Sequence, residues 1–242
     1  MKNIVIKEKE NWLPKNKLLI IQLIVSIASY ITLPFFKPRV DGSKKFFQAN
    51  YSVNHDSLIF DGSTKGYYSK IERIVNIDSF RNKIIFDIGC GNGNLLKWFM
   101  NQSISFEKYI GIDFAIKIST EIKNADFILD DVANISKYLQ GFKSRIFFLS
   151  NVACYLNDEL FIGILNSLKI GDEIVIIDPS PNIFWDAHFK GIKPIYRKIN
   201  KMKEILISNH FVIINDIQDY ALRTKKYFFF PLSYGIVAIK NN

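Results

Sequence analysis

The hydrophobic positions of this chain form short apolar runs that alternate with helical patterns. The runs are rich in β-branched and aromatic residues, and they predict five strands, at residues 84–88, 109–112, 127–129, 146–149 and 173–177. Apolar residues at helical spacing predict helices between them, at residues 95–100, 115–123, 133–139 and 158–168. This alternation is typical of a parallel sheet whose strands are joined by helical crossovers.

The last part of the chain departs from this alternation. A helical pattern covers residues 194–208, and strand patterns follow at 211–217 and 234–239 with no helix between them that is long enough for a crossover. An antiparallel final pair is therefore expected. We predict an α/β fold, a three-layer α/β/α sandwich with a seven-stranded, mostly parallel sheet and an antiparallel last strand.

The first predicted strand runs directly into a glycine-rich turn. Asp87 comes near the end of the strand, and Gly89, Gly91 and Gly93 follow at alternate positions. Glycines lack a Cβ, so a ligand can approach the main chain, and the start of the next helix offers N–H groups without a partner in the helix. A dinucleotide-binding fingerprint needs a small residue at its third glycine position. The residue after Gly93 is Asn94, which departs from that fingerprint.

The pattern D-x-G-C-G-x-G resembles motif I of the class I (Rossmann-like) S-adenosylmethionine-dependent methyltransferases, and the resemblance extends over residues 83–240. It implies a methyltransferase with S-adenosyl-L-methionine as cofactor. In such an enzyme Asp87 would help to hold the cationic methionine end, and the loop would be lined by Gly89, Cys90, Gly91 and Gly93. We interpret Cys90 as a small loop residue, not as a nucleophile.

Acids also close the next two predicted strands. The resemblance implies that Asp113 accepts hydrogen bonds from the ribose hydroxyls, with Phe114 beside it, although a solvated cap of the next helix is an alternative. It also implies that Asp131 contacts the adenine amino group, with Val132 next in the chain. Asp130 takes that role if the register slips by one residue.

The fourth predicted strand ends at Ser150 and Asn151, which the resemblance places beside the methionine moiety. The methyl group of a sulfonium is already activated, so alignment in a dry site supplies most of the catalysis. A base is needed only when the acceptor loses a proton, and the candidates are His188, Tyr155 and His55. The sequence has no H-E-x-x-H pattern and no cysteine cluster, so we predict no metal site.

An N-terminal extension, residues 1–45, precedes a lid or cap segment at 46–82 and the cofactor-binding domain at 83–242. An apolar helix is predicted at about residues 18–33, with basic residues on both flanks that oppose a spanning topology. Two interpretations stay open. Either residues 18–36 lie at the cytoplasmic face of a membrane, or the helix is buried against the domain or a second copy. In both we expect a cytoplasmic enzyme, and no cleavable signal peptide.

Composition narrows the choice of acceptor only a little. The net charge is +9, but the chain is rich in Lys, Ile, Asn and Phe throughout, so the charge reflects a general bias more than a partner. We expect a small-molecule, lipid-linked or glycan-precursor acceptor. The rival functions are an RNA methyltransferase, supported by a basic cluster in residues 190–203, a nicotinamide-dependent oxidoreductase, and a non-catalytic membrane-associated scaffold with the same fold.

Overall fold

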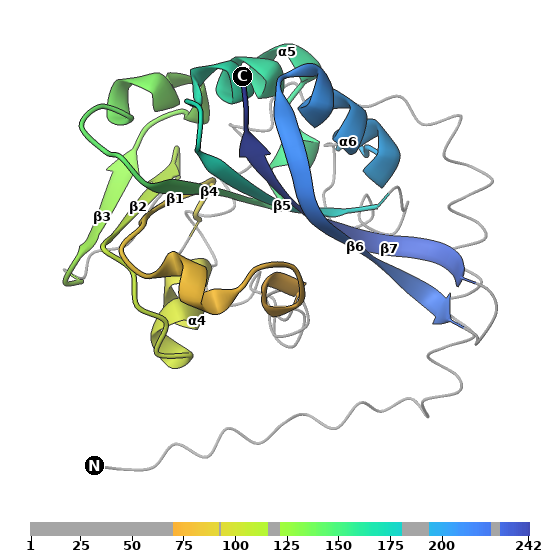
Figure 1. Cartoon of the computed structure of the whole chain (residues 1–242), viewed down its shortest axis with the longest axis horizontal. Coiled ribbons are helices and arrows are strands. Elements are labelled where there is room, and N and C mark those ends of the chain that lie inside the picture. Colours follow the sequence, from red (N-terminus) through yellow and green to blue (C-terminus); the bar gives the residue numbers. More distant parts are fainter. Residues whose placement is uncertain (1–69, 92, 116–121, 181–193, 224–227) are drawn as a thin grey trace.

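A computed structural model describes residues 70–91, 93–115, 122–180, 194–223 and 228–242 (Figure 1). The predicted apolar helix at 18–33 and most of the predicted lid segment lie outside these residues. None of the helices in the described ranges is long and apolar enough to cross a membrane.

The described chain alternates strands and helices as the sequence predicts. Residues 70–74 are helical and are followed by a 3-10 turn, η2, at Ile77–Phe80. The strands are β1 (Ile84–Ile88), β2 (Lys108–Asp113), β3 (Ala125–Leu129), β4 (Arg145–Ser150), β5 (Glu173–Pro179), β6 (Phe211–Arg223) and β7 (Phe228–Lys240). The helical elements are α4 (Asn94–Asn101), η3 (Val132–Tyr138), η4 (Ala153–Tyr155), α5 (Asp158–Ser167) and α6 (Ile199–Ser208).

The seven strands form one sheet in the order β3-β2-β1-β4-β5-β7-β6. The first five strands are parallel, and β7 runs antiparallel to both of its neighbours, β5 and β6. The predicted fold class is therefore confirmed. The order reverses between β1 and β4, and ligands of open α/β sheets bind at such a point, beyond the carboxyl ends of the strands.

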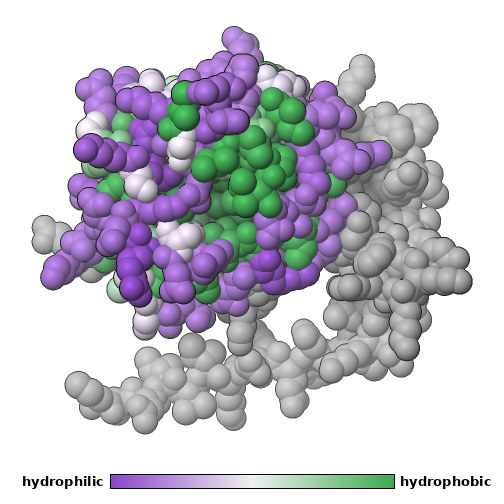
Figure 2. All heavy atoms as spheres, in the orientation of Figure 1, coloured by the Kyte–Doolittle hydropathy of each residue, from purple (hydrophilic) through white to green (hydrophobic). Residues whose placement is uncertain are grey.

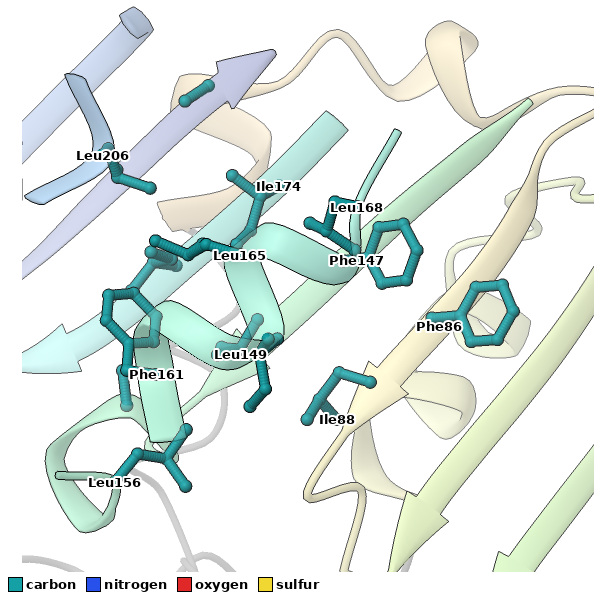
Figure 3. Close-up of a cluster of buried hydrophobic side chains, with 14 of the residues drawn as sticks. Phe86, Ile88, Phe147, Leu149, Leu156, Phe161, Leu165, Leu168, Ile174 and Leu206 are labelled. Carbon is teal, nitrogen blue, oxygen red and sulfur yellow. The ribbon is translucent and has the colours of Figure 1, made fainter. Parts of the chain in front are cut away.

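Helices cover both faces of the sheet, which makes the three layers visible in Figure 1. On one face, side chains of β1, β4 and β5 pack against α5 and α6, and Figure 3 shows this cluster around Phe86, Phe147, Phe161 and Leu165. The rings of Phe86 and Phe147 are stacked with centroids 4.9 Å apart. On the other face, α4 and residues 70–80 cover Ile85, Phe148 and their neighbours. Because β1 and β4 are covered on both sides, their sequences are apolar without alternation.

Two helical predictions are refined by the structure. The helical segment predicted at 133–139 is the 3-10 element η3, which Asp131 caps by accepting a hydrogen bond from the N–H of Ala133 (3.1 Å). The helix expected at 194–208 begins only at Ile199, because Lys198 is extended. Most of the helix expected at 115–123 lies outside the described residues.

Large apolar side chains are also exposed at the two edges of the sheet. Leu129 is exposed on the edge strand β3, and Val212 and Ile214 are exposed on the edge strand β6. Figure 2 shows apolar side chains gathered in the centre of one face and surrounded by polar ones. The described residues therefore leave some large apolar side chains exposed.

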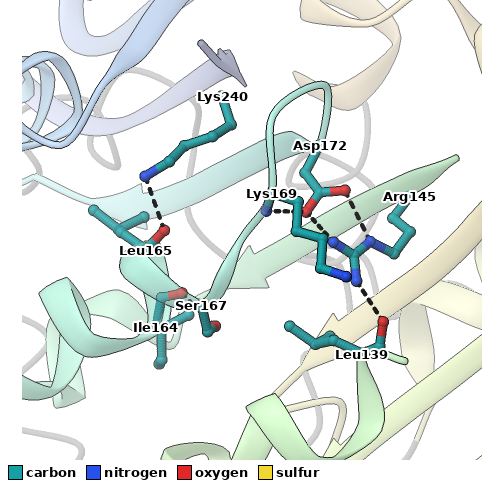
Figure 4. A network of polar contacts seen from close by, with 8 residues as sticks. All are labelled: Leu139, Arg145, Ile164, Leu165, Ser167, Lys169, Asp172 and Lys240. Atoms are coloured by element: carbon teal, nitrogen blue, oxygen red, sulfur yellow. Dashed lines mark hydrogen bonds and ion pairs between the residues drawn. The ribbon is translucent and has the colours of Figure 1, made fainter. Parts of the chain in front are cut away.

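A buried ion pair fixes the amino edge of the sheet, far from the carboxyl ends (Figure 4). Arg145 begins β4 and is 2% exposed. Its Nε donates to Oδ1 of Asp172 (2.8 Å), its Nη2 also donates to Asp172, and its Nη1 donates to the carbonyl of Leu139 (2.7 Å). The lost hydration of both charges is thus replaced by a bidentate pair and a carbonyl contact.

Candidate functional site

The glycine loop between β1 and α4 depends on backbone conformations that favour glycine. Gly89, Gly91 and Gly93 all have positive φ angles, of 71°, 53° and 72°. The N–H of Gly89 donates to the carbonyl of Ile112 on β2 (2.7 Å), which fixes the loop over the neighbouring strand. A Cβ on Gly89 would lie 2.4 Å from Cγ2 of Val152, so any other residue would require the Val152 side chain to move and would also be strained at this positive φ.

Asp87 is buried in β1, with only 3% of its surface exposed. The hydroxyl of Tyr109 on β2 donates a hydrogen bond to its Oδ2. Burial raises the pKa of Asp87 to about 7, and the nearby charge of Asp113 adds to the rise, while the Tyr109 bond opposes it. A cationic group placed beside this carboxyl would favour its ionised form.

Asp113 closes β2 and binds the main chain on both sides of the site. Its Oδ2 accepts from the N–H of Gly91 (2.9 Å), and its Oδ1 accepts from the N–H of Ala115 (2.9 Å). Burial raises its pKa, and these backbone hydrogen bonds oppose the rise. The carboxylate also accepts from the N–H of Phe114. Its two oxygens together have about four acceptor positions, so the side chain can still accept a hydrogen bond from a ligand hydroxyl. Phe114, the next residue, is half-buried.

The side chain of Cys90 is buried and is not a reactive group of the site. A Cβ added to Gly111 would lie 2.8 Å from its sulfur, so the Cys90 side chain packs over the glycine of β2. Burial, with the nearby charges of Asp87 and Asp113, raises the pKa of the Cys90 thiol well above its ordinary range. The thiol is therefore not an activated nucleophile.

The two acids after β3 have different surroundings. Asp130 accepts hydrogen bonds from the hydroxyl of Tyr138 (2.5 Å), the amide of Asn134 (2.8 Å) and the N–H of Asp131 (2.7 Å). These bonds, the one from Tyr138 above all, lower the pKa of Asp130 to about 2. Asp131 caps η3, and Val132 after it is buried. Both acids follow β3 at the carboxyl edge of the sheet.

The end of β4 has two unusual features beside the glycine loop. The buried hydroxyl oxygen of Ser150 has no hydrogen-bond partner within the described part of the chain. Asn151 adopts a left-handed conformation with φ of 57°, which is uncommon for any residue other than glycine. Because β1 and β4 are neighbours in register, Ile88 opposite Leu149, these two residues end their strand next to the loop. A buried hydroxyl without a partner at this point is typical of a ligand site.

The structure thus brings most of the predicted cofactor residues to one edge of the sheet. Of the three candidate bases, Tyr155 is half-buried in η4, and His55 and His188 lie outside the described residues. The described residues contain no group of three or more His, Cys, Asp or Glu side chains that could hold a metal ion.

One buried acid at this edge was not predicted from the sequence. Asp178, in β5, is 1% exposed, and its Oδ1 has no hydrogen-bond partner among the residues that the structure describes. Burial raises its pKa to about 8, although the charge of Arg197 and hydrogen bonds from Cys154 oppose the rise. An acid at the end of a predicted strand was the available signal, but its burial depends on Arg197 and Cys154, which are distant in sequence.

No protein-family model matches this sequence, and no curated protein matches it either. Solved structures do match. The magnesium protoporphyrin IX methyltransferase ChlM from Synechocystis PCC 6803, solved with bound SAH, is 15% identical, with 84% of this chain and 99% of that chain covered and a TM-score of 0.58. A SAM-dependent methyltransferase from Archaeoglobus fulgidus is 21% identical, with 75% and 96% covered and a TM-score of 0.53.

A third match is the plantazolicin methyltransferase BamL, solved with a triazolic desmethylPZN analog and SAH. It is 14% identical, with 95% of this chain and 100% of that chain covered and a TM-score of 0.55. Together with the strand order and the antiparallel β7, these matches identify the fold as that of the class I S-adenosylmethionine-dependent methyltransferases. The expected resemblance is therefore confirmed at the level of the fold.

Proposed function

We propose that this protein is an S-adenosylmethionine-dependent methyltransferase that acts on a small-molecule, lipid-linked or glycan-precursor acceptor. The observation that carries the proposal is the meeting of the glycine loop with the unsatisfied hydroxyl of Ser150 at the point where the strand order reverses. Two of the matched methyltransferases were solved with SAH, which supports the same cofactor here.

The residues at this edge fit the parts of the cofactor. The carboxylate of Asp87 would balance the ammonium, Ser150 and Asn151 would border the methionine moiety, and Asp113 would accept from the ribose hydroxyls. When bound, the cofactor supplies an activated methyl group on a sulfonium, so the protein need only align the acceptor and exclude water.

We assign the adenine end of the site to the acids after β3. Asp131 is the first choice for the adenine amino group, with Phe114 and Val132 beside the adenosine. Asp130 is the alternative, but its carboxylate already accepts three hydrogen bonds within the η3 region. A new donor would have to compete with them.

The rival functions have less support. A dinucleotide-binding oxidoreductase of the all-parallel type does not have an antiparallel β7 between β5 and β6. An RNA methyltransferase was suggested by basic residues at 190–203, but Arg197 is buried, Lys203 pairs with Asp216 and Lys201 pairs with Glu204. Three of the four described basic residues of that cluster are therefore buried or paired, and Lys198 is exposed, so the described part offers RNA only limited positive charge.

Titration calorimetry tests cofactor binding directly. We expect S-adenosylmethionine and S-adenosylhomocysteine to bind and NAD not to bind. Binding of NAD alone would contradict the proposal, and binding of none of the three would favour the non-catalytic scaffold.

Isotope labelling then identifies the acceptor class. Purified protein, cell extract and cofactor labelled in the methyl group are incubated together, and the label is traced in lipid, water-soluble, RNA and protein fractions. The Gly89→Ala variant serves as the control for labelling by other enzymes, because its loop cannot keep the same conformation. Label that appears mainly in RNA would overturn the proposed acceptor class.

A further inference from the structure

Arg197 is a buried residue that joins two segments near the carboxyl edge of the sheet. It lies just before α6 and is 4% exposed. Its Nη1 donates to the carbonyl of Ala153 (2.7 Å), and its Nη2 donates to the carbonyl of Leu156 (2.7 Å). Asp158, in the first turn of α5, accepts from Nε (3.0 Å) and from Nη2 (2.6 Å). One guanidinium group therefore binds both ends of η4 and the start of the next helix.

Other contacts hold the same segment from the side of β5. The carboxylate of Asp178 accepts hydrogen bonds from the N–H and the thiol of Cys154. The carbonyl of Cys154 accepts from the N–H of Ile195 (2.7 Å), and the N–H of Asn151 donates to the carbonyl of Ile177 (2.8 Å). The main chain after β4 is thus bound to residues on both sides of the 181–193 stretch. We call Asp178, Ile195 and Arg197 the clamp.

The segment held by the clamp adjoins the candidate cofactor site. It begins with the strained Asn151, and Val152 contacts the position where Gly89 has no Cβ. A shift of this segment would move both Asn151 and the wall of the glycine loop. Small displacements of binding groups weaken alignment strongly in sites of this kind.

We propose that Arg197 is a positioning residue, which through the clamp holds the segment after β4 in the conformation that binds the methionine end of the cofactor. This inference rests on the proposed function.

Arg145 provides a matched control within the same chain. Like Arg197, it is buried, pairs with an aspartate, donates to a carbonyl oxygen and lies 5.5 Å from the centre of a phenylalanine ring. It differs in place, because it lies at the amino end of β4 and contacts no residue of the candidate site. If a buried arginine matters only for stability, the two residues should behave alike.

The experiment compares Arg197→Met with Arg145→Met, well below the melting temperature of each. We expect both variants to melt at lower temperature than the wild type. Only Arg197→Met should weaken S-adenosylhomocysteine binding, by about tenfold or more in calorimetry, and Arg145→Met should stay within about twofold of wild type. Hydrogen exchange should be faster at the amides of Tyr155 and Leu156 in the first variant only.

Milder variants cover the case in which Arg197→Met fails to fold. Arg197→Lys keeps the positive charge but lacks the planar guanidinium group that contacts two carbonyl oxygens and a carboxylate at once. It should therefore weaken binding, but less than Arg197→Met does. Asp158→Asn, at a side chain that is 62% exposed, should leave binding nearly unchanged. Added guanidinium ion should partly restore binding to Arg197→Ala but not to Arg145→Ala.

The outcomes separate the two proposals. If the wild type binds S-adenosylhomocysteine and the Arg197 variants bind it equally well, the clamp does not position the site and the inference is wrong, while the proposed function stands. If the wild type binds neither cofactor form, the proposed function fails first and the inference fails with it.

Discussion

Tyr109 donates a hydrogen bond to Asp87, so two neighbouring strands share one buried polar contact two residues before Gly89. The contact matters because Asp87 is the acid expected to meet a cation. In the protein alone, burial holds the pKa of Asp87 at about 7, so at neutral pH a large fraction of the carboxyl groups keep their proton. Binding of an ammonium must then remove that proton.

Cofactor affinity should therefore rise with pH through about 7. Below the pKa each binding event releases a proton from Asp87, so the dissociation constant should increase by up to about tenfold for each pH unit. We expect S-adenosylmethionine to bind several times more weakly at about pH 6 than at about pH 8, as measured by titration calorimetry.

Two variants test the assignment of this pH dependence to Asp87. Asp87→Asn should bind weakly at every pH, with a flat profile. Tyr109→Phe removes a hydrogen bond that lowers the pKa of Asp87, so its profile should move to higher pH. A wild-type affinity that does not change across this range would contradict the role of Asp87.

The stability of the protein should fall as the pH rises from about 4 to about 8. Asp87 and Asp178 have folded-state pKa values of about 7 and about 8, above their ordinary value of 3.8. Between these values the folded state keeps protons that the unfolded state has lost. The free energy of unfolding therefore decreases with pH in that window and levels off above it.

Urea denaturation at a series of pH values measures this slope. Asp178→Asn removes one of the two groups but keeps an oxygen that can accept from Cys154, so the decrease should end near pH 7 in that variant, about one unit lower than in the wild type. If the variant and the wild type have the same profile, the pKa of Asp178 is not raised.

The parallel part of the sheet could be predicted because burial on both faces makes a strand apolar along its whole length. The runs at 84–88 and 146–149 are of this kind, and both match observed strands to within one residue. The last two strands were predicted too short. Gln218 and Asp219 lie in β6 beyond the predicted end at residue 217, where pairing with β7 keeps a polar segment extended.

The candidate site was predictable only where its residues are consecutive or end a strand. The glycine loop, Asp113, Ser150 and Asn151 met that condition. In the sequence, Tyr109 cannot be told from an ordinary strand residue. Arg197 cannot be told from the other members of the basic cluster at 190–203, because its hydrogen-bond partners lie 39 to 44 residues away. Contacts of this kind depend on tertiary structure, which no local pattern encodes.

Gly89→Ala should be more damaging than another glycine substitution with the same backbone strain. Gly89 has a φ of 71°, and its Cβ would lie 2.4 Å from Val152. Gly141 has a φ of 83°, but a Cβ there would meet nothing within 4 Å. We expect Gly141→Ala to cost about 1–2 kcal/mol from the backbone alone, and Gly89→Ala to cost about 1–3 kcal/mol more.

Denaturation of both variants measures the difference, and cofactor titration shows whether the loop still binds. Adding Val152→Ala to Gly89→Ala should recover part of the lost stability, because it removes the atoms nearest to the new methyl group. No recovery in the double variant would mean that the backbone conformation alone makes glycine necessary.

Tyr234 offers a test of whether a buried hydroxyl is used. The residue is fully buried in β7, opposite Asp178 in the register of β5, and its oxygen has no hydrogen-bond partner among the described residues. A buried hydroxyl without a partner costs free energy, so Tyr234→Phe should leave stability unchanged or increase it by about 1 kcal/mol. Tyr109→Phe is the matched control, because its hydroxyl bonds Asp87, and it should lose about 1–3 kcal/mol. If thermal and urea denaturation instead show a clear loss for Tyr234→Phe, the hydroxyl has a partner in solution, and the space between Tyr234 and Asp178 then holds a polar group.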